Sequence, residues 1–350
     1  MNNYNQNEEI LFKKQQKTDC NDERFKIIFP PDVRFLHSYN CLHEHQSVHW
    51  TAHEFQPEYD REKFLQAPII LQKINLEFIA CLMYGDSFVL DAFNEEILMA
   101  DLQSIEVKSM FIDQAAREIV HQEIYSKMLQ VSSPATDDYN YYRSKKFFQQ
   151  RLGKFDKFIS EENLASYKND FRFLLFIIML CENIMFAPMF HSLCYLAITG
   201  YAPKLCDANV QVMRDEYLHY KHARGLLLDE STCVFTVKPE KSKLRKIFFN
   251  FKKIVIEIIK DIIPANFNTS DNLFNLDISL RHFEYVCFQF LKENSLLDLS
   301  VDKIINESPA KTYMILPQNE TRINLMESKS TIYLVEEGGK NDYDKIDMNF

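Results

Sequence analysis

The feature that most constrains this chain is the short segment Glu118-Ile-Val-His121-Gln-Glu-Ile-Tyr125. In a helix, Glu118, His121 and Tyr125 lie three and seven positions apart and therefore share one face. The same face continues through Phe111 and Met128, which are apolar. A charged carboxylate on a core-facing stripe costs several kcal/mol unless a partner compensates it. The stripe therefore predicts a buried partner for its polar groups, and a bound metal is one such partner.

The composition favours a helical protein. Apolar residues make up 46% of the 350 residues and aromatic residues 13%, whereas only 6 residues are glycine. The net charge of -10 argues against a general nucleic-acid-binding protein, whose surface is basic. The 8 cysteines form no Cys-x-x-Cys pair and indicate reduced thiols in a cytosolic or nuclear protein, not a secreted disulfide framework. Residues 1–16 are polar and do not resemble a signal peptide.

Two segments raise the question of a membrane. The stretch 173–198 is long and apolar enough to span a bilayer, but Glu182 and Pro188 interrupt it. A carboxylate near the middle of such a span costs about 3 kcal/mol. We therefore expect a fully buried core helix. The segment 238–263 is basic and amphipathic, and we interpret it as a solvated outer helix rather than a membrane-surface helix.

Hydrophobic periodicity divides the chain into helices and connections. Polar residues 1–24 predict a flexible N-terminal segment, 25–307 a helical domain, and 308–350 a flexible tail. Within the domain, 131–140 is rich in Ser, Pro and Asp and predicts a linker. Asp207 or Asn209 is the expected cap of a later helix. The expected helices are 32–45, one or two over 61–94, and then 102–130, 147–160, 163–199, 207–228, 238–263 and 273–297.

A second Glu-x-x-His pair, Glu216 and His219, also lies on an apolar helical face, and two other predicted helices each offer one acid, Asp86 and Glu182. About one Glu-x-x-His match is expected by chance in a chain of this composition. The stronger evidence is that both pairs lie on otherwise apolar helical faces. Two Glu-x-x-His helices and two single-carboxylate helices make the ligand set of a ferritin-like di-metal carboxylate bundle. Hard oxygen ligands with one histidine per metal suit iron or manganese better than zinc. We predict an all-α, ferritin-like bundle with additional helices.

Other chemistries lack a motif in this sequence. There is no Gly-x-Gly-x-x-Gly, no glycine-rich phosphate loop, no Gly-x-Ser-x-Gly and no His-Glu-x-x-His. Nucleotide cofactors, serine hydrolysis and zinc proteolysis are therefore unsupported.

With these residues in place, the chain resembles the small, radical-generating subunit of class I ribonucleotide reductase. The resemblance covers about residues 21–264 and the last few residues, and the six ligand types occur in the family's order. The segments that carry it are Phe25-Lys-Ile-Ile-Phe-Pro, His49-Trp50-Thr-Ala-His-Glu54, Tyr84-Gly-Asp86-Ser-Phe-Val, Glu118 to Tyr125, Glu182-Asn-Ile-Met-Phe186, and Arg214-Asp215-Glu216-Tyr-Leu-His219.

The resemblance implies a cofactor of two iron ions per chain, with Glu118 and Glu216 bridging them. A Mn/Fe pair is an alternative that the sequence leaves open. Reaction of the reduced metals with dioxygen would leave a stable radical on Tyr125. The implied metal ligands are Asp86, Glu118, His121, Glu182, Glu216 and His219. Phe186, Phe190 and Val212 would keep the surroundings of the radical dry.

The resemblance also implies a route for the electron. Trp50, Asp215 and His121 would form a hydrogen-bonded path toward the surface. A tyrosine of the tail, Tyr343 or Tyr333, would continue this path to a partner protein.

That partner would be the large subunit, which reduces ribonucleoside diphosphates to deoxyribonucleotides for DNA replication. The end of the chain, Ile346-Asp-Met-Asn-Phe350, resembles the acidic, Phe-terminated peptide with which the family docks on the large subunit. A cytoplasmic homodimer is expected, without nucleic-acid or membrane partners.

The chain also departs from the family pattern. The spacing from Asp86 to Glu118 is one residue longer than expected, Val212 replaces the usual Ile, and Pro188 is expected to distort its helix. Two alternatives stay open. One is another ferritin-like di-iron oxidase or hydroxylase, which gives no joint reason for Tyr125, Trp50 and the tail. The other is a non-catalytic helical protein that binds iron or a partner.

Overall fold

The computed structural model describes residues 29–92, 104–160, 171–229, 231–235 and 238–314. Within these ranges the ordered elements are helices, and the β structure is limited to one isolated bridge between Asn268 and Asn275. The prediction of an all-α protein is therefore confirmed for the described part of the chain.

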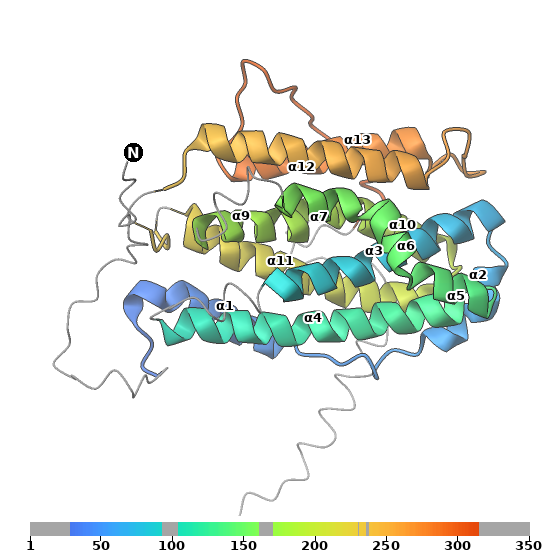
Figure 1. Cartoon of the computed structure of the whole chain (residues 1–350), viewed down its shortest axis with the longest axis horizontal. Coiled ribbons are helices and arrows are strands. Elements are labelled where there is room, and N and C mark those ends of the chain that lie inside the picture. The colour runs from blue at the N-terminus through green and yellow to red at the C-terminus, as the bar shows by residue number, and fades with distance from the viewer. Residues whose placement is uncertain (1–28, 93–103, 161–170, 230, 236–237, 315–350) are drawn as a thin grey trace, which may run out of the picture.

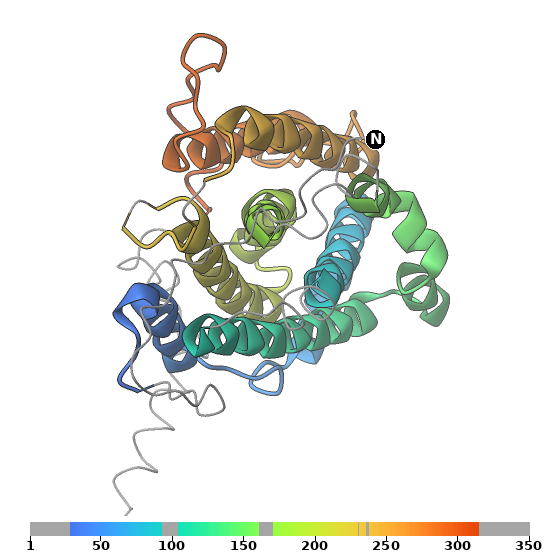
Figure 2. The same cartoon turned by 60° about the vertical axis from the view of Figure 1, so that its left-hand side comes forward.

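Four chain segments form the inner part of the molecule. α3 packs along α4, and α11 packs along α9 and α10. In Figure 2 α3, α4 and α11 lie around the α9–α10 stretch, which is seen nearly end-on. The bounds of these elements are α3 (Ile69–Ala92), α4 (Ile105–Ser132), α9 (Phe171–Leu180), the π-helical turn η4 (Cys181–Met185), α10 (Ala187–Thr199) and α11 (Pro203–Leu227).

Shorter and outer helices surround this inner part. α1 packs on α4 and α11, whereas α12 and α13 pack on each other at the opposite side (Figure 1). Their bounds are η1 (Val33–Phe35), α1 (Leu36–Ser47), η2 (Pro57–Asp60), α2 (Arg61–Leu65), α5 (Thr136–Tyr142), α6 (Lys145–Arg151), α7 (Gly153–Ser160), α12 (Lys241–Ile262) and α13 (Leu276–Glu293).

The helix α4 begins and ends through local hydrogen bonds. The Ser104 side chain caps its N-terminus by accepting a hydrogen bond from Val107 N. The helix continues to Ser132, and α5 begins already at Thr136. The predicted linker over 131–140 is therefore wrong except for its central residues. Its Ser and Asp residues occur at helix ends, where such residues are favoured, and this is why the stretch had the composition of a loop.

The apolar stretch 173–198 lies in the core, as predicted. The helical stretch Phe171–Thr199 is long and apolar enough to cross a membrane, but 83% of its most apolar window is buried inside the molecule. The stretch is not one regular helix, because η4 interrupts it and α10 restarts after Phe186. Pro188 lies in the first turn of α10, where its missing N–H costs little.

The start of α11 differs from the prediction. The helix begins at Pro203, so neither Asp207 nor Asn209 is its cap, and Asn209 is buried within the second turn. Proline is favoured at the first position of a helix because its φ is already helical, and this signal outweighs the capping preference of Asp and Asn. The predicted break before it is confirmed, since Gly200 ends α10 in the left-handed region with a φ of 71°.

Residues 308–314, which composition assigns to the tail, pack against the helical domain. Ala310 and Tyr313 are buried. The Tyr313 hydroxyl donates to the Leu273 carbonyl oxygen at 2.9 Å and lies 2.7 Å from His191 Nε2 on α10. The polar part of the C-terminal segment beyond residue 314, like residues 1–28, lies outside the described residues.

The helix α12 has the expected character of an outer amphipathic helix. Its buried residues recur every three or four positions, and they pack against α13, α3, α7, α9 and η4. These buried residues are Leu244, Ile247, Phe248, Phe251, Val255, Ile258, Ile259 and Ile262. The apolar face of α12 is therefore used inside the protein and needs no membrane.

The close approach of α3 to η4 yields a prediction about Gly85. A Cβ atom at Gly85 would lie 2.4 Å from Cε1 of Phe186, whose side chain is fully buried. We expect Gly85→Ala to destabilise the protein by about 1–3 kcal/mol, because the ring has no free space into which to move. Chemical denaturation followed by circular dichroism measures this. Gly153→Ala is the control, since its Cβ meets only Gln149 Cβ at 4.0 Å, and equal stability of the two variants would contradict the packing argument.

Candidate metal centre

The structure brings the six predicted metal ligands together from four chain segments. They form two overlapping groups whose ligand atoms lie within 4.8 Å of one another, and Glu118 and Glu216 belong to both groups. None of the six is more than 3% exposed. The six residues are Asp86 of α3, Glu118 and His121 of α4, Glu182 of η4, and Glu216 and His219 of α11.

The first group joins α3, α4 and α11. His121 Nδ1 lies 3.0 Å from Glu216 Oε1 and 3.3 Å from Glu118 Oε2. Asp86 completes this group from α3. The spacing of Glu118 and His121 along α4 turns both side chains toward the same point, as expected for residues three positions apart.

The second group joins α4, α11 and η4. His219 Nδ1 lies 2.8 Å from Glu216 Oε2, 3.1 Å from Glu118 Oε1 and 3.7 Å from Glu182 Oε1. Each histidine therefore turns Nδ1 toward the shared carboxylates and keeps Nε2 for a contact on the far side of its ring. In both halves of the centre, a histidine Nδ1 faces the two shared carboxylates.

Burial and neighbouring charges raise the pKa of two of the four acids and of both histidines. Burial, reinforced by the neighbouring carboxylates, raises the pKa of Asp86 and of Glu182 well above the usual value. Burial alone would lower the pKa of His121 and His219, but the surrounding carboxylates outweigh it and hold both well above the usual value. Without a metal, protons therefore supply part of the positive charge that this centre requires. Metal ions binding there would displace them.

Several polar atoms in this centre are buried without a hydrogen bond, although the rest of the core satisfies most of its polar groups. Some of them lie close to an opposite charge but lack the orientation of a hydrogen bond. Such atoms cost free energy unless a cation compensates them. They are both oxygens of Asp86, Oε2 of Glu118, Oε2 of Glu182, Oε1 of Glu216 and Nδ1 of His121. The donor set of four carboxylates and two histidines therefore fits a pair of iron or manganese ions.

Tyr125 lies on α4 one turn beyond His121, and its side chain is completely buried. Its hydroxyl donates a hydrogen bond to Asn209 Oδ1 of α11 at 3.1 Å. Burial, together with the negative charge of Asp86, raises the pKa of the Tyr125 phenol well above 10. The phenol is therefore protonated and has no contact with water. The three residues predicted to shield it, Phe186, Phe190 and Val212, are also buried.

The predicted chain of polar contacts from His121 to Trp50 is present. The Trp50 indole N–H donates to Asp215 Oδ2 at 2.7 Å, and His121 Nε2 donates to the same oxygen at 3.2 Å. The indole and imidazole rings are stacked with their centroids 5.8 Å apart. Arg117 lies beside this chain, with Nε 3.3 Å from Asp215 Oδ2 and Nη1 donating to the Trp50 carbonyl oxygen at 2.6 Å. These contacts hold the buried Trp50 side chain at a fixed position beside His121.

Sequence reasoning missed three further residues of this centre. Gln114 Nε2 donates to Glu182 Oε1 at 2.9 Å, Arg117 supports Trp50, and Asn209 contacts the Tyr125 phenol. Gln114 lies one turn before Glu118 on the same stripe, so helical spacing could have indicated it. Asn209 lies three positions before Val212 and seven before Glu216, so the same spacing could have indicated it, whereas Arg117 lies off the stripe of α4 and carries no comparable signal. Tyr343, Tyr333 and the peptide 346–350 lie outside the described residues.

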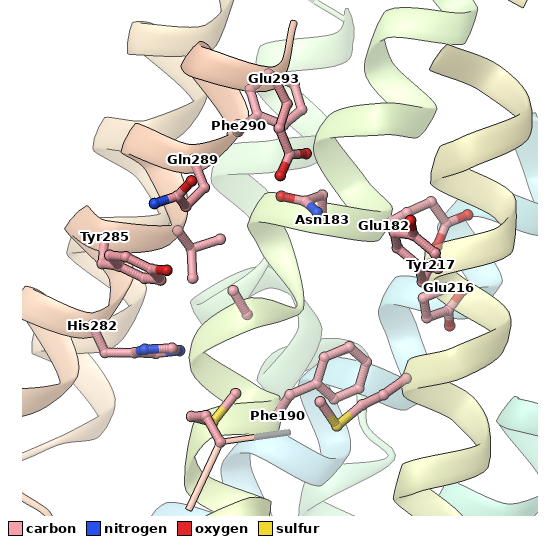
Figure 3. A pocket seen from close by; sticks show the side chains of 14 residues that line it. Glu182, Asn183, Phe190, Glu216, Tyr217, His282, Tyr285, Gln289, Phe290 and Glu293 are labelled. Carbon is pink, nitrogen blue, oxygen red and sulfur yellow. The ribbon is translucent and has the colours of Figure 1, made fainter. Parts of the chain in front are cut away.

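A cavity borders the centre on the side of α13. It contains about 670 Å³ of empty space, including its open mouth. Gln289, Glu293, Asn183, Glu182 and Glu216 are among its lining residues, and Figure 3 shows Glu293 of α13 beside Asn183, with Glu182 and Glu216 farther from α13. The candidate centre is therefore adjacent to solvent-connected space on one side, although its own carboxylates are buried.

A helical bundle that encloses four carboxylates and two Glu-x-x-His histidines belongs to the ferritin-like carboxylate class. Solved structures agree with this fold. The ribonucleotide reductase Rnr4 homodimer from Saccharomyces cerevisiae is similar with a TM-score of 0.64 and 19% identity, covering 82% of this chain and 87% of that one. The dimanganese(II)-NrdF of Streptococcus sanguinis is similar with a TM-score of 0.58 and 13% identity, covering 84% of this chain and 99% of that one.

Sequence comparisons give the family. The model of "Ribonucleotide reductase, small chain" matches residues 33–284. The small chain of ribonucleoside-diphosphate reductase from African swine fever virus is 24% identical over 325 residues, 89% of this chain and 92% of that protein. The small subunit from human herpesvirus 8 is 27% identical over 170 residues, 48% of this chain and about half (54%) of that protein. The chain belongs to the ribonucleotide reductase small chain family, as its motifs predicted.

The ligand assignment yields a prediction for His219. We expect His219→Ala to lower the metal content of the reconstituted protein toward one ion per chain, because each Glu-x-x-His pair serves one metal. Anaerobic loading with ferrous iron followed by elemental analysis measures this. His53→Ala is the control, because the His53 side chain is 82% exposed. Unchanged metal content in His219→Ala would contradict the assignment.

Proposed function

We propose that this chain is the radical-generating small subunit of a ribonucleoside-diphosphate reductase and that Tyr125 stores the radical. The observation that carries the proposal is the position of this buried phenol, one helical turn from His121 and beside a centre of six ligands. Membership in the small chain family supports the same reaction. The radical would pass to a large subunit, which would use it to reduce ribonucleotides to deoxyribonucleotides.

Two metal ions per chain are proposed for the centre. Asp86 and His121 would hold one ion, Glu182 and His219 would hold the other, and Glu118 and Glu216 would be shared. The donor set is compatible with two iron ions and also with a Mn/Fe pair. After reaction with dioxygen, such a metal pair supplies the one-electron oxidising power that removal of an electron from a phenol requires.

The protein's own part is to make Tyr125 lose an electron and a proton and then to protect the resulting radical. The phenol is held at a fixed position by its hydrogen bond to Asn209 Oδ1. Its complete burial in the apolar core, to which Phe186 also belongs, excludes water and soluble reductants. A neutral phenoxyl radical suits such an environment, because burying a charge would be costly there.

Transfer of the radical would use the contacts between His121, Asp215 and Trp50. The His121 and Trp50 side chains both donate a hydrogen bond to the same oxygen of Asp215. Burial would raise the pKa of Asp215, but the hydrogen bond from His121 and the nearby positive charges outweigh it and hold the pKa below the usual value. Asp215 therefore stays an acceptor for both partners. Arg117 fixes the position of Trp50 through its carbonyl oxygen.

The partner contacts are proposed from the family and from the end of the sequence. Residues 346–350, ending at Phe350, would dock on the large subunit, and Tyr343 or Tyr333 would relay the radical across that interface. Two copies of the chain would form a homodimer, as in the yeast Rnr4 structure. The cytoplasm is the proposed location.

The open alternatives receive less support. Another di-iron oxidase needs no buried tryptophan linked to a metal-facing histidine, and Trp50 is linked in this way. A non-catalytic protein has no need to keep every ligand, yet all six are present and converge. The radical-generating function is therefore the better explanation of the same residues.

The proposal predicts the outcome of Tyr125→Phe. Protein loaded with ferrous iron and exposed to oxygen should show a tyrosyl radical in its electron paramagnetic resonance spectrum. In Tyr125→Phe this signal should vanish while the iron content is unchanged, because the phenyl ring keeps the packing but has no oxidisable hydroxyl. Tyr59→Phe is the control, since Tyr59 is 69% exposed. A radical that persists in Tyr125→Phe would show that Tyr125 is not the site.

A second prediction concerns the end of the chain. Removal of residues 344–350 should abolish binding to the large subunit of the same organism, measured by analytical ultracentrifugation. The radical signal should be retained, because none of the residues of the metal centre is removed. Normal pairing by the truncated protein would show that these residues are not the docking element.

A further inference from the structure

His45 and Asp113 extend the polar network of the centre in a direction that the proposed electron route does not use. His45 of α1 is completely buried, and its Nε2 lies 3.2 Å from Nε2 of the metal-facing His219. On the other side of the same ring, His45 Nδ1 lies 2.6 Å from Asp113 Oδ2 of α4. Three side chains from α11, α1 and α4 therefore form one continuous line that starts at a metal ligand.

The direction of each hydrogen bond in this line follows from the chemistry of its end groups. The carboxylate of Asp113 can only accept, so His45 Nδ1 must carry the hydrogen. In a neutral imidazole the other nitrogen is then a lone pair, so His45 Nε2 is an acceptor. It can take the N–H of His219 Nε2. A metal ion would occupy the lone pair of His219 Nδ1, which leaves the single hydrogen of that ring at Nε2.

The alternative arrangement is unfavourable. If His219 carried its hydrogen on Nδ1, this N–H would point at the position of the metal, and the two Nε2 atoms of His219 and His45 would oppose each other as lone pairs. Asp113 prevents this by fixing the hydrogen of His45 on the side away from His219. The line therefore orients the His219 ring and also selects its protonated nitrogen.

The other half of the centre has a shorter version of the same device. His121 Nε2 donates directly to Asp215, which is buried and shared with Trp50. For His219 the carboxylate lies one residue further away, and the Asp113 side chain is 20% exposed. A histidine that binds a metal needs a hydrogen-bond partner on its other ring nitrogen to fix its orientation. Loss of such a partner at other metal sites costs about 10–100-fold in metal affinity.

We propose that His45, held by Asp113, is a positioning residue for His219 and fixes the orientation and tautomer in which this ring offers Nδ1 to the second metal ion. The inference rests on the proposed function, because it requires His219 to be a ligand. It concerns residues outside the predicted ligand set and outside the electron route.

The test compares His45→Leu with His45→Gln in the full-length, metal-free protein titrated with Mn(II). The free ion is counted by electron paramagnetic resonance, which gives the affinity for each of two ions without any activity measurement. Leu fills the space but accepts no hydrogen bond. Gln offers an oxygen to the N–H of His219 and an amide group to Asp113. We expect about 10–100-fold weaker binding of one ion in His45→Leu and near-normal binding in His45→Gln.

Two further variants separate positioning from packing. Ser38→Ala removes a hydrogen bond between the same two helices, Ser38 Oγ to His222 Nε2 at 2.9 Å, and should leave both affinities unchanged. Asp113→Ala removes the hydrogen-bond acceptor of His45 Nδ1. Because Asp113 is partly exposed, this substitution puts folding less at risk. It should weaken the binding of the same metal ion that His45→Leu affects. Asp113→Asn keeps an acceptor for His45 Nδ1 and should restore most of this affinity.

The outcomes distinguish the inference from the proposed function. If the wild-type protein binds two ions and His45→Leu binds both with unchanged affinity, the inference is overturned and the ligand assignment stands. If Leu preserves affinity better than Gln, His45 serves packing, and the inference is again overturned. If the wild-type protein binds no Mn(II) or Fe(II), the assignment of His219 as a ligand fails and the inference fails with it.

Discussion

The structure depends on the burial of four carboxylates next to two histidines inside a helical bundle. The four acids lose their hydration, and five of their eight oxygen atoms gain no hydrogen bond in return. Mutual repulsion in a dry interior would drive the helices apart, so positive charge must be present in some form. Protons on Asp86, Glu182 and the histidines supply part of it in the metal-free chain, and two cations would supply it completely. Metal binding and the stability of the bundle are therefore linked.

The helix α4 shows how one amphipathic stripe can serve both the fold and the chemistry. Phe111 and Met128 anchor its two ends in the apolar core, while Glu118, His121 and Tyr125 lie between them. The same stripe thus orders the ligands and the phenol along a rigid element, at a distance set by the helical rise. Arg117, one residue before Glu118, leaves this stripe and connects α4 to the segment that carries Trp50. Small movements of α4 would disturb every part of the centre together.

Much of the fold and of the site was predictable from residues that are periodic or close in sequence. Two Glu-x-x-His pairs and two acids on apolar faces predicted the bundle and its ligands, because a buried charge on such a face needs a reason. The missing details depend on contacts between distant segments. Asn209 has the preference of a cap, yet it lies inside α11 because Pro203 starts the helix earlier, and its partner Tyr125 lies on another helix. His45 and Asp113 were equally hidden, since neither lies on a stripe of unusual composition.

The π-helical turn η4 could not be predicted from periodicity. It is the reason why the buried stretch 171–199 is not one regular helix. An uninterrupted helix through 171–199 would be the simplest way to bury so apolar a stretch. The wider turn at Cys181–Met185 adds a residue and rotates everything after it by about 100° relative to a continuous helix. Such turns are rare within α-helices and are frequently found at functional sites.

Here the turn carries Glu182, and the rotation it causes applies to the helix that bears Phe190. The Phe186 ring comes against the backbone of α3 at Gly85, next to Asp86. A regular helix would have to give up either the direction of the Glu182 carboxylate or the position of the rings proposed to shield Tyr125. The departure from regular helical geometry therefore occurs at the point in the bundle where the metal ligands and the apolar pocket impose different requirements on one segment.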